Sequence, residues 1–156
     1  MVARIVSPAK ALRTLRKTDA LLTRQFAAFN QADAETLRDG PEGWSVLQIA
    51  CHLRDFEVIW SQRVALMLAE DNPTFPDFDY QAAVNVNRYA EQDFATVCVK
   101  LTAQRAALIA QLEGLSDEHW LRPGLHPAQG PGTILDVAVN AGLHDLDHLE
   151  QLSRCG

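Results

Sequence analysis

The 156-residue sequence lacks three features that would each point to a particular class of protein. No apolar run approaches the roughly 18–20 residues that span a bilayer. Residues 1–7 are too short and too broken a segment to form a signal peptide. Positive charge is scarce, with 14 Lys and Arg against 20 Asp and Glu, whereas binding to a nucleic-acid backbone needs a cationic surface. We therefore expect a cytoplasmic protein that binds neither membranes nor nucleic acids.

Cysteine is also scarce, and its placement excludes two kinds of site. Cys51, Cys98 and Cys155 are odd in number and widely spaced, which disfavours a disulfide framework and a CxxC metal site. Cys51 and Cys98 fall inside helical patterns, where a free cysteine usually packs as a small apolar side chain. The apolar fraction of 47% and the charged fraction of 22% are typical of a globular protein. We expect a single domain over residues 1–156.

Four long segments have the apolar spacing of a helix, and none alternates convincingly as a half-buried strand does. The first helix is expected to begin at Ser7-Pro8, because serine caps a helix and proline fits its first turn. Asp19 falls in the one gap of its apolar stripe, which consists of Leu12, Leu15, Leu22, Phe26 and Phe29. A polar loop is expected to follow and to end at residues 40–43.

The other three helices have clear starts or stops. Ser45 and Gln48 can form a capping box at the start of the second helix, which should stop at Asn72-Pro73. A connector over residues 72–79 leads to a third helix over about residues 80–112. A second connector, residues 115–132, precedes a fourth helix that Thr133 and Asp136 would cap and that ends near Ser153. The sequence thus predicts an all-α fold, a four-helix bundle.

Two histidines of the fourth helix are candidate metal ligands. His144 and His148 are four residues apart, so their rings lie one above the other on the same helix face and can bind one ion. Both fall on the apolar stripe, where two imidazoles are costly unless both rings are satisfied. The alternative is a pair of buried histidines that bond to backbone and water.

A metal site on this helix needs at least one further ligand, and His52 in the second helix is the best candidate. It lies at the border of that helix's core stripe. The alternative for His52 is a boundary histidine with one ring nitrogen in water. His119 and His126 fall in the connector before the fourth helix, and we leave both outside the ligand set.

Several aspartates lie near these histidines in the sequence. Asp145 and Asp147 flank the pair, and Asp55 follows His52 by about one turn. Carboxylates commonly accept the free ring N–H at histidine metal sites. We nevertheless expect plain solvation for each of these three aspartates. Asp19 could face the site or a buried water.

The order and spacing of these motifs resemble the DinB-like superfamily of four-helix bundles, also called DinB/YfiT-like. The resemblance covers roughly residues 8–153. Its motifs are Gly43-Trp44-Ser45 with His52 seven residues on, His126-Pro127 with Gly130 before Thr133, and His144-x-x-x-His148-x-x-Gln151-Leu152.

The resemblance implies a divalent metal, zinc or nickel, held by three histidines near one end of the bundle. Carried over by position, the ligands are His52, His144 and His148, and all three are present. Known activities in the superfamily include thiol transfer with low-molecular-weight thiols and an isomerase that depends on such a thiol. Many members are called metal-dependent hydrolases. Dimers are common, and long amphipathic helices leave room for a homodimer here.

A centre of three neutral imidazoles with an open coordination position is typical of catalysis rather than structure. The metal could activate a water for hydrolysis or bind a thiol cosubstrate as its thiolate, and a soft sulfur ligand suits zinc or nickel. The first hypothesis is therefore a metal-dependent enzyme acting on a small molecule, a thiol S-transferase or a hydrolase. Its pocket would be bordered by Trp44 and the connector around residues 120–130.

Two other functions stay open at this point. A stress-associated protein could hold a metal or small ligand without turnover, since no obvious general base or oxyanion donor accompanies the histidines. A purely structural bundle with solvated histidines is the third reading.

Overall fold

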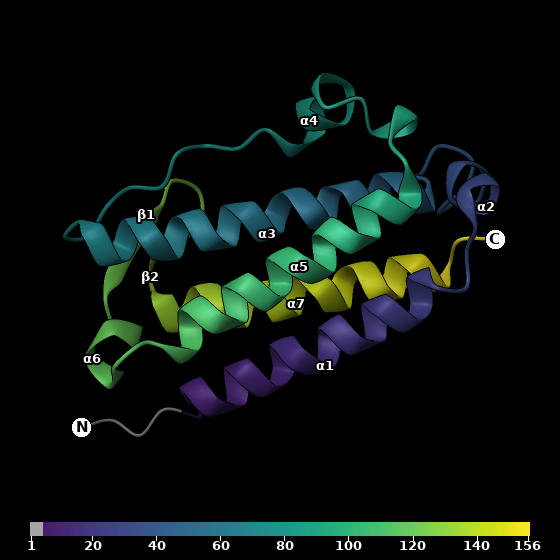
Figure 1. Cartoon of the computed structure of the whole chain (residues 1–156). Helices are drawn as coiled ribbons and strands as arrows, with labels where there is room; N and C mark the ends of the chain where they lie inside the picture. Colours follow the sequence, from purple (N-terminus) through teal and green to yellow (C-terminus); the bar gives the residue numbers. More distant parts are fainter. Residues whose placement is uncertain (1–4) are drawn as a thin grey trace.

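Four long helices form the bundle: α1 (Pro8–Phe26), α3 (Val46–Ala69), α5 (Phe94–Glu113) and α7 (Ile134–Ser153) (Figure 1). The structure is a computed structural model that describes residues 5–156. Helix α1 packs against α5 and α7, and α3 packs against the same two helices, so α1 and α3 lie at opposite corners. The predicted helical bundle is confirmed. Residues 1–4, part of the segment considered above as a signal peptide, lie outside the described range.

The starts of the two helices that carry the candidate ligands are fixed by capping boxes. At α3, the Gln48 amide donates to Ser45 Oγ (3.1 Å), and the Ser45 amide donates to Gln48 Oε1 (2.8 Å). At α7, the Thr133 amide donates to Asp136 Oδ2 (2.8 Å), and the Asp136 amide donates to Thr133 Oγ1 (3.3 Å). Both predicted capping boxes are confirmed, and each satisfies two amides that a helix start leaves free.

The core residues follow the predicted stripes closely. Within the described chain, no helix is long and apolar enough to cross a membrane. Leu12 and Phe29 are only half-buried. The other members of the first predicted stripe, Leu15, Leu22 and Phe26, are buried. The apolar residues that repeat at helical spacing along α3 and α7 are buried as well and include Leu53, Trp60, Val64, Met67, Val137, Ala141 and Leu152.

The prediction of one helix over residues 80–112 is wrong, because the segment is broken twice. It contains α4 (Tyr80–Val86), a short 3-10 turn η1 (Tyr89–Glu91) and then α5. Arg88 adopts a left-handed conformation with a φ of 51°, which ends the helical path. Asp93 then caps α5 by accepting the Thr96 amide at 2.9 Å.

The polar loop predicted after the first helix contains a further short helix. Helix α1 ends at Phe26, three residues earlier than its stripe suggested, and α2 (Gln31–Thr36) follows. Asn30 caps α2 by accepting the Asp33 amide at 2.8 Å.

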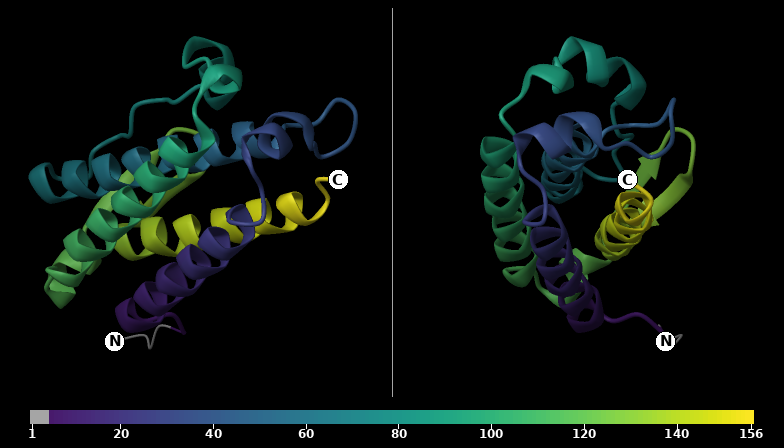
Figure 2. Two further views of the ribbon diagram at one scale, coloured as in Figure 1. Left: turned by 45° about the vertical axis from the view of Figure 1, so that its right-hand side comes forward. Right: turned by 90° about the vertical axis from the view of Figure 1, so that its right-hand side faces the viewer.

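The connector before α7 contains a helical turn, α6 (Asp117–Trp120), and a small antiparallel hairpin that the sequence did not suggest. Strand β1 (Pro123–His126) pairs with β2 (Gly130–Thr133). The segment that follows α3 lies beside this hairpin, because the Phe75 amide donates to the Leu125 carbonyl at 2.9 Å. Figures 1 and 2 show the rest of this segment and α4 passing over α3, on the side away from α1. The two connectors therefore lie beside the part of α3 and α7 that carries the histidines.

Candidate metal centre

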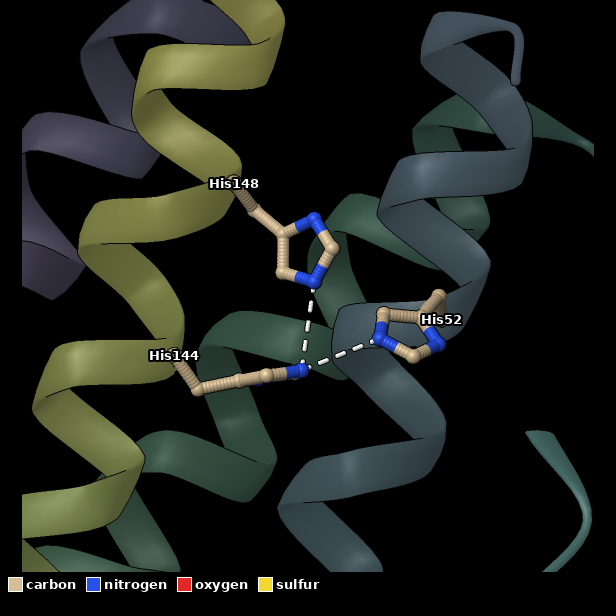
Figure 3. A group of neighbouring side chains, drawn as sticks. All are labelled: His52, His144 and His148. Atoms are coloured by element: carbon tan, nitrogen blue, oxygen red, sulfur yellow. Dashed lines mark hydrogen bonds between the residues drawn. The ribbon is translucent and has the colours of Figure 1, made fainter. Parts of the chain in front are cut away.

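His144 and His148 lie one turn apart on α7 and face His52 on α3 (Figure 3). The Nε2 atom of His144 lies 3.0 Å from Nε2 of His52 and 3.1 Å from Nε2 of His148. A ligand nitrogen from each of the three rings lies within 4.8 Å of the other two. The structure thus brings all three candidate ligands together. His52 is buried, with an exposed fraction of 3%, and lines a cavity at the edge of the core.

These distances suit a single ion. Metal–nitrogen bonds of about 2.0–2.1 Å place two ligand nitrogens about 2.8–3.0 Å apart at a right angle and about 3.3–3.4 Å apart at a tetrahedral angle. Three lone pairs pointed at one another repel, and the protons of neutral imidazoles cannot satisfy every pair at once. The convergence therefore fits a shared cation better than a set of histidine–histidine hydrogen bonds.

The three imidazoles are held in the neutral form that a metal requires. Burial lowers the pKa of His52 to about 2, and the neighbouring His148 and His144 add to that effect. Burial also lowers the pKa of His144 to about 3, with His148 and Arg105 contributing. For His148 burial again lowers the pKa, although a hydrogen bond to Gln151 opposes it.

One ring has a partner that fixes its tautomer, and that partner is not an aspartate. His148 Nδ1 lies 2.8 Å from Gln151 Oε1, which accepts its proton and leaves the Nε2 lone pair for a ligand. Gln151 is three residues beyond His148 on α7, so helical spacing alone could have indicated the pair. Within residues 5–156, Nδ1 of His52 and Nδ1 of His144 have no hydrogen-bond partner.

The aspartates near the histidines behave differently from one another. The expected solvation suits Asp147, which is exposed. It is wrong for Asp145, which is 1% exposed and bonded to Arg105 and Thr18. Asp55 is half-buried and accepts hydrogen bonds from Asn87 and Tyr89, so it supports the 87–89 turn. Asp19 is half-buried and lines a separate, mainly apolar hollow beside Phe26 and Phe94.

Arg105 of α5 is the centre of a buried network that links all four long helices. Its Nε and Nη2 donate to the Glu57 carboxylate on α3 at 2.9 and 2.5 Å. Nη2 also donates to Asp145 Oδ1 on α7 at 3.0 Å, and Nη1 donates to the Leu15 carbonyl on α1 at 3.0 Å. Burial disfavours the charge of Arg105, but the two carboxylates outweigh it and raise its pKa. One cation therefore faces two buried carboxylates, and its charge acts on His144.

Aromatic rings surround the histidine cluster. His52 packs against Trp44, Phe56 and Tyr80, with ring centroids 4.9, 4.8 and 5.8 Å away. Phe56 and Trp60 pack against His144 at 4.6 and 5.7 Å. An apolar surrounding of this kind strengthens electrostatic interactions at the ligands.

The three histidines open onto a cavity of about 820 Å³. Trp44 and residues 126, 128 and 129 line it, as expected for the pocket border. The other walls come from Phe78, Tyr80 and Gln81, which the sequence had placed in a connector and at the start of a long helix. Arg63 and His126 also line the cavity, although neither had been picked out as a site residue.

Comparisons with known proteins agree with this architecture. The model of the DinB superfamily matches residues 9–152. No curated protein matches the chain. YfiT from Bacillus subtilis, described as a probable metal-dependent hydrolase with an unusual four-helix bundle topology, superposes with a TM-score of 0.82. It shares 22% identity over 99% of this chain and 92% of its own.

A second solved structure has a different described activity. The mycothiol-dependent maleylpyruvate isomerase superposes with a TM-score of 0.79 and 15% identity, over 94% of this chain. The match spans only 61% of the isomerase. A histidine-to-alanine mutant of that isomerase superposes with a TM-score of 0.80 at 13% identity. At these identities the likeness shows a shared fold.

Proposed function

The chain belongs to the DinB superfamily, and from this premise we propose that it is a metal-dependent enzyme that acts on a small molecule. The ligands would be His52, His144 and His148, and the ion zinc or nickel. The observation that carries this proposal is the convergence of the three Nε2 atoms at the wall of an 820 Å³ cavity.

The buried charges beside the cluster act on the histidines in opposite directions. The Asp145 carboxylate opposes the lowering of the His148 pKa, whereas the Arg105 guanidinium adds to the lowering of the His144 pKa. Burial raises the pKa of both Glu57 and Asp145, and their ion pairs with Arg105 oppose that effect. A divalent ion at the histidines would favour the charged forms of these two carboxylates in a region of low dielectric constant, where such interactions are strong.

We expect the nucleophile to come from outside the polypeptide. Among the described residues, no serine, threonine or cysteine lines the cavity. Burial raises the pKa of Cys51 to about 12 and that of Cys98 to about 11, so neither is a ready thiolate. A bound zinc or nickel ion supplies a site where water or a low-molecular-weight thiol loses its proton at neutral pH. We favour the thiol, because a soft sulfur ligand suits these metals, and hydrolysis is the variant of the same proposal.

The chain's own residues would hold the ligands and keep bulk water out. Gln151 sets the tautomer of His148, and Phe56 and Trp60 pack against the His144 ring. Trp44 and Tyr80 cover His52. The small molecule would enter between α7 and the segment that carries Phe78 and Tyr80.

A protein that holds a metal or small ligand without turnover is the second candidate. The carboxylates that line the cavity within the described chain, Asp77 and Asp147, are both exposed, so neither has the environment of a tuned general base. An assay for turnover distinguishes the two candidates, because only the enzyme would convert a substrate.

We also expect a homodimer and a cytoplasmic location, and both stay predictions. Leu143 and Leu146 on α7 are exposed, which favours self-association, and Leu143 also borders the cavity. Sedimentation analysis of the purified chain would test the dimer.

The deciding experiment uses protein loaded with zinc or nickel, a panel of thiols and a chromogenic electrophile. The panel would include cysteine, glutathione and mycothiol, with an activated ester alongside to detect hydrolysis. We expect turnover that needs both the metal and one thiol, that is lost in His148→Ala and that is kept in Cys98→Ser. Metal binding without turnover in any combination would support the second candidate instead.

A further inference from the structure

Arg63 on α3 is a buried cation without a carboxylate partner among the described residues. Its side chain lines the cavity of the histidine cluster and is 8% exposed. Among residues 5–156 it forms no ion pair, and its buried Nε has no hydrogen-bond partner. Arg105 shows the usual solution for a buried arginine in this chain, with carboxylates on two sides. An unpaired buried charge is costly, and a site that tolerates one is a candidate for binding an anion.

The guanidinium lies close to two aromatic rings. Its central carbon lies 5.2 Å from the ring centroid of Trp60 and 5.2 Å from that of Phe75. Aromatic rings stabilise the faces of a guanidinium but leave the N–H groups at its edge unused. That edge presents the paired donors that fit a carboxylate or a phosphate.

His126 adds a second donor beside Arg63. Its Nδ1 accepts the amides of Ala128 and Gln129 at 3.1 and 3.0 Å, so the neutral ring carries its proton on Nε2. Burial lowers the pKa of His126, and the charge of Arg63 adds to that effect. The ring packs against Phe75 at 6.5 Å, on the hairpin side of the cavity. The β1–β2 turn therefore fixes which proton this histidine can donate.

The carboxylates nearby do not neutralise Arg63. Asp77 and Asp147 line the cavity, and the charge of Asp77 acts on His126. Neither carboxylate forms an ion pair with Arg63 in the part of the chain that the structure describes, and burial is the only influence that shifts the Arg63 pKa, which it lowers. The protein has a net charge of −6 at pH 7, so a general attraction for anions is absent. Affinity for an anion would have to come from this local arrangement.

We propose that Arg63 and His126 bind an anionic group, a carboxylate or a phosphate, of the small molecule that enters the cavity. This inference rests on the proposed function only in treating the cavity as a substrate site. Trp60 contacts both Arg63 and His144, at 5.2 and 5.7 Å, so the separation of guanidinium and imidazole cannot exceed the sum of those distances. One small anionic molecule can therefore reach both the guanidinium and the histidine cluster.

The test is a titration of metal-free protein followed by NMR, with succinate and methyl phosphate as probes and succinamide as the neutral analogue. Without metal, the anions cannot bind by ligating an ion at the histidines. We expect at least one of the two anions to shift the Arg63 Nε resonance in the wild type. The Arg63→Met substitution should weaken the binding of that anion about tenfold or more. Succinamide should bind weakly to both proteins.

Three further variants sharpen the result. Arg63→Lys keeps a positive charge and most of the packing but loses the planar donor pair, so its affinity should be intermediate. His126→Phe should also weaken anion binding. Arg16→Met, which removes a surface arginine paired with Glu113, should bind as the wild type does.

Equal anion affinity in the wild type and in folded Arg63→Met or Arg63→Lys would overturn the proposal. Folding is checked by the thermal midpoint of each variant. The outcome is independent of the metal: Arg63-dependent binding in a protein that takes up no zinc or nickel would leave this site standing while the proposed function fails. If turnover depends on the metal but Arg63 has no role in anion binding, the proposed function stands and the anion site fails.

Discussion

The Nε2 atoms of His52 and His144 lie 3.0 Å apart, although 92 positions separate the two residues in the chain. Their meeting depends on how α3 packs against α7 and not on any local motif. The His144–His148 pair, in contrast, is set by one turn of α7. The local helix geometry of α7 therefore places two of the three ligands, and the packing of α3 against α7 places the third.

Loss of the Gln151 side chain should weaken metal binding without abolishing it. Gln151→Ala removes the acceptor that keeps the His148 proton on Nδ1, and such outer partners are worth about 10–100-fold in metal affinity. Competition with a chromogenic zinc chelator measures the change. Glu150→Ala, an exposed neighbour on the same helix, is the control and should bind zinc as the wild type does. Unchanged affinity in Gln151→Ala would mean that the His148 tautomer does not depend on this contact.

Arg105→Met should destabilise the fold severely. The substitution leaves the buried carboxylates of Glu57 and Asp145 without their cation, a change that costs about 3–5 kcal/mol. Urea denaturation of the metal-free protein measures the free energy of unfolding. The surface substitution Arg16→Met is the matched control, and loss of its pair with Glu113 should cost less than about 1 kcal/mol. Comparable losses in the two variants would contradict the assigned role of the buried network.

The metal-free protein should lose stability as the pH falls below about 6.5. In the unfolded chain His52 and His144 titrate near pH 6.5, whereas burial lowers their folded pKa values to about 2 and about 3. Below pH 6.5 the unfolded state takes up protons that the folded state does not, and this uptake favours unfolding. The free energy of unfolding is therefore highest above pH 6.5 and falls on acidification. Each histidine should cost about 1 kcal/mol between pH 6 and pH 5.

Urea denaturation at several pH values compares the wild type with the His52→Gln/His144→Gln variant. The variant should show a flatter dependence of unfolding free energy on pH over this range. Parallel curves for the two proteins would show that the rings are not held neutral.

Local features explain what could be predicted from the sequence. The boxes at Ser45 and Thr133 involve residues three positions apart, and the apolar stripes repeat within one helix. The break at Arg88 was missed because the apolar stripe of the predicted third helix begins only at Phe94, the first residue of α5, and so carried no information about residues 80–93. The β1–β2 hairpin has strands of only four residues and is supported by the segment around Phe75, which lies far away in the sequence.

The site could be predicted only where its residues share a helix or a family motif. His144 and His148 follow from spacing, whereas His52 lies at the border of a second stripe and is identified as a ligand by the family motif. The pairing of Arg105 with Glu57 and Asp145 involves three different helices and is visible only after they pack. Arg63 was missed for a different reason: a charged residue beside a stripe usually extends into water, and only its burial against Trp60 and Phe75 distinguishes it.

The most direct test of the central claim is the metal content of protein purified without a histidine tag or chelator. Plasma mass spectrometry would compare the wild type with the His144→Ala/His148→Ala variant. We predict close to one zinc or nickel ion per chain in the wild type and none in the variant. No metal in either protein, and no uptake when zinc or nickel is added, would contradict the three-histidine metal centre.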